Sequence, residues 1–76
     1  MNALADLLKG IRPEFDFTVS RDFIADGMLD SFDMVMLVAT LDKTFGISIA
    51  GVDIIPENFQ NLDTIAALLN KYGIQP

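Results

Sequence analysis

Apolar residues between positions 31 and 45 recur at the spacing of an α-helix, and this stretch constrains the fold more than any other. It predicts a helix from about Ser31 to Phe45, with Gly46 as its C-terminal stop. One arc of this helix would pack against a core: Met34, Leu37, Val38, Leu41 and Phe45. Four more apolar residues fall on roughly the opposite arc: Phe32, Val35, Met36 and Ala39. Because the outer side of a surface helix is normally polar, this second arc predicts an interaction surface. The alternative is that the loop before the helix covers Phe32 and Val35, while Met36 and Ala39 are ordinary exposed residues.

Two other stretches also have helical spacing. The first predicts a helix from about Asn2 to Gly10 or Ile11, and the second predicts one that is capped by Asn61 and continues to about Lys71. Their expected buried residues are Leu4, Leu7, Leu8 and Ile11 in the first helix, and Leu62, Ile65, Leu68, Leu69 and Tyr72 in the last. The segment 56–59 suits one short helical turn with Pro56 at its first position.

The segment from Arg12 to Leu29 has no sustained period and predicts a long loop that aromatic side chains pin to the core. Three phenylalanines lie in it: Phe15, Phe17 and Phe23. The whole chain therefore predicts a small all-α, four-helix bundle, with three main helices, one short helix and a long loop between the first two. We expect residues 1–76 to form a single domain.

Composition narrows the possible functions. The chain has no cysteine and no histidine, so it lacks disulfides, thiolate metal ligands and the commonest general base. We therefore expect neither an enzyme nor a metal site. A net charge of -6 argues against a nucleic-acid partner and favours basic protein surfaces. The N-terminus does not resemble a signal peptide and no segment could span a membrane, which predicts a cytoplasmic protein, and we expect a monomer.

Ser31 lies where the long loop becomes the second helix, between Asp30 and Phe32. Free backbone N–H groups and the positive end of the helix dipole favour a bound phosphate at such a position. An exposed hydroxyl there could be a covalent attachment point. The alternative is that Asp30 and Ser31 serve only as helix caps, because both residue types are favoured there.

Over nearly its whole length the chain resembles the acyl carrier proteins, which hold 4'-phosphopantetheine on a serine. The resemblance rests on an ordered set of motifs: Asp30-Ser31, the core positions Leu37, Val38, Leu41 and Phe45, the segment Phe45-Gly46-Ile47-Ser48-Ile49, and Leu62-Asp63-Thr64-Ile65. It implies that Ser31 is the attachment site and that Asp30 is its acidic neighbour. A phosphopantetheinyl transferase would supply the arm from coenzyme A. The carrier would then deliver acyl or aminoacyl thioesters to partner enzymes.

The resemblance also implies a docking surface on the second helix, formed by Phe32, Asp33, Val35, Met36, Ala39 and Asp42. The two aspartates would steer partners electrostatically. Many family members read Gly-x-Asp-Ser-Leu, whereas this chain reads Met28-Leu29-Asp30-Ser31-Phe32. That form is more similar to discrete carriers such as the D-alanyl carrier proteins. It implies partners that include an acyl-loading or adenylating ligase and downstream acyltransferases or synthases.

Two other interpretations remain open at this point. An unmodified acidic helical module could use the same apolar face to bind another protein. A calcium loop is the second possibility, because Asp22, Asp26, Gly27 and Asp33 match four positions of an EF-hand. Against it, Ile24 stands where an oxygen ligand belongs, and no helix leads clearly into the loop. The sequence does not identify the cargo or the pathway.

Overall fold

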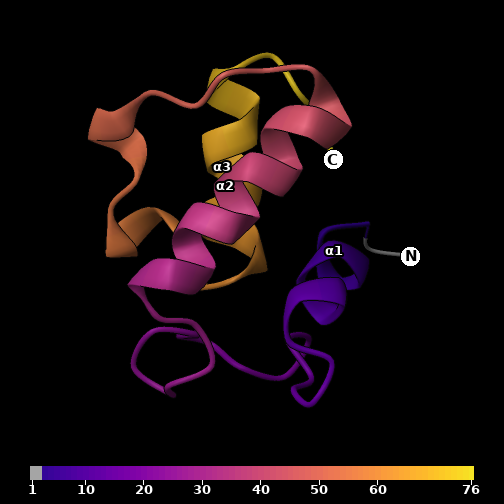
Figure 1. Ribbon diagram of the computed structural model, residues 1–76, viewed down its shortest axis with the longest axis vertical. Coiled ribbons are helices and arrows are strands. Elements are labelled where there is room, and N and C mark those ends of the chain that lie inside the picture. The colour runs from indigo at the N-terminus through magenta and orange to yellow at the C-terminus, as the bar shows by residue number, and fades with distance from the viewer. Residues whose placement is uncertain (1–2) are drawn as a thin grey trace.

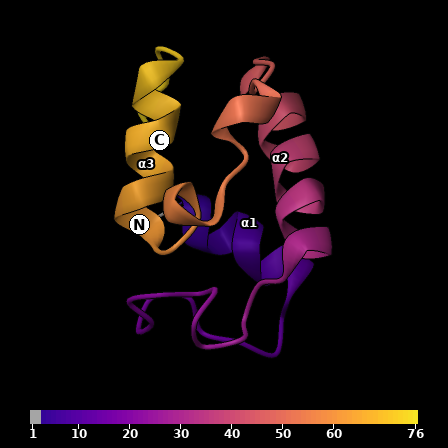
Figure 2. The ribbon, with the colours of Figure 1, turned by 90° about the vertical axis from the view of Figure 1, so that its left-hand side faces the viewer.

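The computed structural model describes residues 3–76 as three α-helices and two short 3₁₀ turns. Helix α1 (Ala3–Ile11) and helix α2 (Ser31–Phe45) are joined by the long loop, and the turns η1 (Gly51–Asp53) and η2 (Pro56–Asn58) precede α3 (Leu62–Lys71). Within the described residues there is no β-strand. Figure 2 shows α2 and α3 on opposite sides of the molecule with α1 crossing between them. The predicted all-α architecture is confirmed.

The helix ends agree closely with the sequence prediction. Helix α2 covers the predicted residues and stops at Gly46, whose φ of 66° is in the left-handed region that glycine favours. Asn61 caps α3 through a reciprocal capping box with Thr64, and Pro56 opens η2. The predicted start of the first helix at Asn2 lies outside the described residues.

The core is formed by side chains from all three helices and from the segments that join them. Among residues 3–76, fifteen buried apolar residues form one cluster, and four of them are on α2: Met34, Leu37, Val38 and Leu41. Phe45, the fifth residue of the predicted inner arc, is partly buried against this cluster. One face of α2 is therefore fixed by packing, which determines the direction in which its other face points. Figure 1 shows this helix in front of α3.

Aromatic packing fixes the long loop, as predicted. Phe17 and Phe23 are buried, and their rings meet edge to face with centroids 4.9 Å apart. The backbone of Phe23 donates to the Gln60 carbonyl at 2.6 Å and accepts from the N–H groups of Met28 and Leu29 at 2.8 and 3.1 Å. These bonds hold the loop just before the start of α2 and so set the position of that helix end.

The turn η1 was not predicted, and a polar cluster around Asp53 accounts for it. The Asp53 carboxylate accepts from Lys71 Nζ at 2.8 and 2.9 Å and from the Tyr72 hydroxyl at 2.6 Å. The hydrogen bond from Lys71 lowers the pKa of Asp53. In turn, the Tyr72 hydroxyl accepts from the Ala50 N–H at 2.8 Å. This turn is thus held by partners far along the chain, which no local pattern reveals.

Candidate functional site

The N-terminus of α2 is capped by Asp30 and not by Ser31. The Asp30 carboxylate accepts from the Asp33 N–H at 2.9 Å, and the Asp33 carboxylate accepts from the Asp30 N–H at 3.2 Å. This reciprocal pair is a capping box. Ser31 is the first helical residue, is exposed, and forms no side-chain hydrogen bond with residues 3–76. Capping therefore explains Asp30, and within the described part of the chain it gives the Ser31 hydroxyl no structural role.

The backbone around Ser31 suits an attached phosphate. In the described part of the chain, the N–H groups of Ser31 and Phe32 have no hydrogen-bond acceptor, as expected for the first turn of a helix. They lie at the positive end of the α2 dipole, which favours an anion there. The Asp30 side chain is 65% exposed, so a reacting group can approach Asp30 as well as Ser31. An exposed hydroxyl beside free N–H donors fits a phosphopantetheine arm joined through a phosphodiester.

Asp33 does not lie on the exposed surface where the sequence prediction placed it. Only 4% of the residue is exposed, and its carboxylate is turned toward the loop that follows α1. There one carboxylate oxygen, Oδ2, accepts a hydrogen bond from Arg12 Nε at 3.0 Å and forms an ion pair with Arg12 Nη2, 2.9 Å away. The capping box and the ion pair with Arg12 draw this side chain inward. Asp33 is therefore not available to steer a partner.

Arg12 is the residue of this site that the sequence analysis missed. Besides Asp33, its guanidinium contacts Glu14 at 3.2 Å and Asp30 at 3.8 Å. It follows α1 directly, and in Figure 2 that end of α1 lies beside the first turn of α2. The spacing of Asp30 and Asp33 could have suggested a capping box. Arg12 is 21 residues away from Asp33 in the sequence, and no local signal connects the two.

The ion pair predicts how stability depends on pH. The hydrogen bond from Arg12 lowers the pKa of Asp33 in the folded chain, against the opposing effect of burial. The unfolded chain has the ordinary value of about 3.9. The ionised carboxylate therefore contributes stability above about pH 4, which is lost as the pH falls through the lower folded pKa. We expect the melting temperature of the parent to fall more steeply below pH 4 than that of Asp33→Asn.

The measurement is a series of thermal melts between neutral and acidic pH. Glu57→Gln is the matched control, because Glu57 is exposed and forms no ion pair with the described residues. Its curve should follow that of the parent. Parallel curves for the parent and Asp33→Asn would contradict the prediction.

The outer face of α2 is exposed, as the sequence predicted for its apolar residues. Exposed fractions are 71% for Phe32, 60% for Val35 and 40% for Met36, and Ala39 is exposed as well. The long loop does not cover them. We call these four residues the outer face of α2. Asp42 is half-buried in the last turns of the helix, and its Oδ1 accepts from the Ile49 N–H at 3.0 Å.

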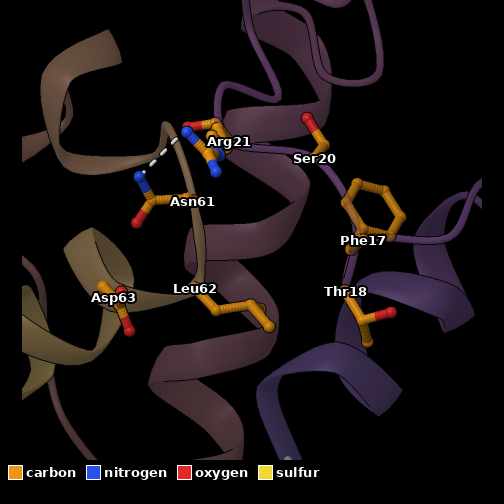
Figure 3. A pocket seen from close by; sticks show the side chains of 7 residues that line it. All are labelled: Phe17, Thr18, Ser20, Arg21, Asn61, Leu62 and Asp63. Carbon is orange, nitrogen blue, oxygen red and sulfur yellow. Dashed lines mark hydrogen bonds between the residues drawn. The ribbon is translucent and has the colours of Figure 1, made fainter.

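A hollow lies elsewhere, between the long loop and the start of α3. It has a volume of about 420 Å³ and is lined by the seven residues labelled in Figure 3: Phe17, Thr18, Ser20, Arg21, Asn61, Leu62 and Asp63. The Asn61 amide closes one side by donating to the Arg21 carbonyl at 3.1 Å. Ser31 does not line this hollow.

The acidic residues that match an EF-hand do not gather into one cluster in residues 3–76. Asp22 accepts from the backbone N–H groups of Ile24 and Ala25, and Asp26 accepts from the Ser20 hydroxyl. Asp33 is paired with Arg12. Among residues 3–76, no group of three or more acidic, histidine or cysteine side chains could hold a metal ion. In the same part of the chain, no helix is long and apolar enough to cross a membrane.

Comparison with known proteins gives a family match over most of the chain. A family model described as a phosphopantetheine attachment site matches residues 1–70 of the 76. The matched region includes the long loop, all of α2 and both 3₁₀ turns. No curated protein and no solved structure matches the chain significantly.

Proposed function

This chain belongs to the family of phosphopantetheine attachment domains, and from that premise we propose that Ser31 is the residue that carries the arm. Domains of this family hold 4'-phosphopantetheine covalently and are carriers, not enzymes. One observation carries the proposal for Ser31. Ser31 is exposed and is the first residue of a helix. Its hydroxyl has no hydrogen-bond partner in residues 3–76, because Asp30 caps the helix.

The chemistry requires little of the chain beyond this hydroxyl. Ser31 Oγ would attack the pyrophosphate of coenzyme A in the active site of a separate transferase that supplies Mg²⁺. The new Oγ–P bond forms as the bond to the adenosine 3',5'-bisphosphate leaving group breaks, and the hydroxyl proton passes to a base of the transferase. The free N–H groups of Ser31 and Phe32 would then face the phosphodiester.

The arm supplies a terminal thiol that carries acyl or aminoacyl groups as thioesters. The chain itself contains no cysteine, so the thiol that forms the thioester would be the one at the end of the arm. Tethering makes each delivery an encounter at high effective concentration. The resemblance of the Leu29-Asp30-Ser31-Phe32 stretch to discrete D-alanyl carriers supports loading by an adenylating ligase, followed by downstream acyltransferases or synthases.

We propose that partner enzymes dock on the outer face of α2. Its apolar residues continue directly from Ser31, so a partner that covers them also receives the arm. Met36 adds a flexible side chain that can pack against different partners. Asp42 lies about 16 Å along the helix axis from Ser31, and its remaining carboxylate oxygen supplies charge at the far end of the surface.

A charged substitution in the centre of the docking surface should impair modification. Val35 is 60% exposed, and covering it would contribute part of the 1.5–3 kcal/mol or so typical of a buried valine. We expect Val35→Asp to lower kcat/KM of the transferase by about tenfold or more. Val52→Asp is the control, since Val52 is 82% exposed but lies in η1. Equal losses in both variants would refute docking on α2.

The direct test of the carrier function is intact-protein mass spectrometry of the apo chain after incubation with a promiscuous transferase, coenzyme A and Mg²⁺. We expect a mass increase of one phosphopantetheine. No increase, from a chain shown to be folded and unmodified beforehand, would favour the other candidate. That candidate is an unmodified interaction module, and the exposed apolar outer face of α2 is the observation in its favour.

A further inference from the structure

One oxygen atom of Asp33 connects the end of α1 to the turn that carries Ser31. Asp33 Oδ2 accepts hydrogen bonds from Arg12 Nε at 3.0 Å and from the Asp30 backbone N–H at 3.2 Å, and it forms an ion pair with Arg12 Nη2 at 2.9 Å. The Asp30 N–H belongs to the residue just before Ser31. The Asp33 carboxylate is thus shared between the capping box and the guanidinium.

From this arrangement we propose that Arg12 is a positioning residue for the modification of Ser31, acting through the Asp33 carboxylate. The proposal rests on the proposed function, because it assumes that Ser31 receives the arm. Arg12 does not take part in the chemistry. It holds the first turn of α2 in one conformation, so that the Ser31 hydroxyl has a fixed direction when the transferase binds.

Burial is the first reason that Asp33 depends on Arg12. A carboxylate that is 4% exposed stays ionised only where charge and hydrogen bonds compensate its lost hydration. Arg12 provides both, through the Nε–H hydrogen bond and the ion pair of its guanidinium with the same oxygen, and its side chain is 35% exposed. Without it, Asp33 would turn toward water or take up a proton. Either change would weaken the hydrogen bond from the Asp30 N–H to Asp33 and allow the first turn of α2 to sample several conformations.

Geometry is the second reason. The guanidinium is a rigid fork that comes from a helix end 21 residues earlier in the sequence, so it links two parts of the fold. A reacting group held in one orientation reacts faster than one that samples several. Negative charge is also concentrated around Arg12, because the carboxylates of Glu14 and Asp30 lie within 4 Å of its guanidinium. Arg12 compensates that charge where a pyrophosphate has to approach.

The test compares transferase kinetics for Arg12→Gln and Arg12→Lys with those of the parent. At a temperature where every variant is folded by circular dichroism, we expect Arg12→Gln to lower kcat by about tenfold, with a smaller change in KM. Arg12→Lys keeps the charge without the fork and should recover only part of the rate. Arg21→Gln removes an equal charge from an exposed side chain with no ion pair in the described residues, and should match the parent.

A double variant distinguishes positioning from direct contact with the transferase. If Arg12 acts through Asp33, the rate of Arg12→Gln/Asp33→Asn should lie within about twofold of that of Arg12→Gln alone. This variant removes both charges of the pair and so leaves no unpaired charge buried. If the double variant lost rate by the product of the losses in Arg12→Gln and Asp33→Asn, the proposal would be overturned. A parent-like rate for Arg12→Gln would also overturn it.

Amide hydrogen exchange of the apo protein provides a readout that does not depend on any transferase. We expect faster exchange of the Asp30 and Asp33 amides in Arg12→Gln, while the amides in the middle of α2 keep their protection. Unchanged exchange at both amides would overturn the proposal. If the parent chain took up no arm, the proposed function would fail instead, and the exchange result would still report on the Arg12–Asp33 link.

Discussion

Replacing Ser31 with alanine should abolish modification completely and leave the fold intact. The attacking oxygen is the only atom that the change removes, and an alanine at this position has no hydroxyl to join to phosphorus. Ser31 is exposed and forms no side-chain hydrogen bond in residues 3–76, so no structural contact is lost. Alanine is also the best helix former, and the cap at Asp30 is unaffected. Intact mass after the transferase reaction and a thermal melt measure the two outcomes.

Ser48→Ala is the matched control for this prediction. Ser48 is an exposed serine that follows α2 instead of starting it. We expect this variant to gain one arm as the parent does. Uptake of the arm by Ser31→Ala would contradict the site assignment, and loss of folding in Ser31→Ala would contradict the claim that the hydroxyl has no structural role.

Of the substitutions that we propose, replacing Phe23 with alanine should produce the largest loss of stability. Phe23 is fully buried, packs edge to face on Phe17, and its backbone makes three of the bonds that fix the long loop. A buried phenylalanine replaced by alanine costs about 3–5 kcal/mol. A domain of this size has a total free energy of unfolding of only about 4–11 kcal/mol. We therefore expect the melting temperature to fall by about 12 °C or more.

Val19→Ala is the control, because Val19 lies in the same loop and is 76% exposed. Its melting temperature should stay within about 3 °C of the parent value. A fall of less than about 5 °C for Phe23→Ala would mean that the long loop contributes little to the core. In that case the first turn of α2 could not owe its position to this loop.

The features that the sequence predicted correctly are those with local signals. Helix α2 has five inner apolar positions at regular spacing and a glycine stop, so both its extent and its exposed face could be derived from the residues. Asn61 with Thr64, and Pro56 at the start of η2, are signals of the same local kind. The Asp30-Ser31 dipeptide located the candidate site, but on its own it did not show which of the two residues caps the helix.

The features that the sequence analysis missed depend on residues far apart in the chain. Asp33 was expected to face partners, because the resemblance to carrier proteins implies acidic residues on the docking surface of the second helix. Its burial follows from a guanidinium that only the folded chain brings to it. The turn η1 depends in the same way on the bonds from Lys71 and Tyr72 to Asp53. Periodicity determines which side of a helix is apolar, but not which charged groups pair across the fold.

The most direct test of the account is to locate the arm on the modified parent protein. The parent would be converted by the transferase, digested, and fragmented in a mass spectrometer, so that the added mass is assigned to one residue. The chain has three serines, Ser20, Ser31 and Ser48, and these can be separated by their fragments. We predict that all of the phosphopantetheine is on Ser31. Its detection on another residue, with Ser31 unmodified, would contradict the central claim.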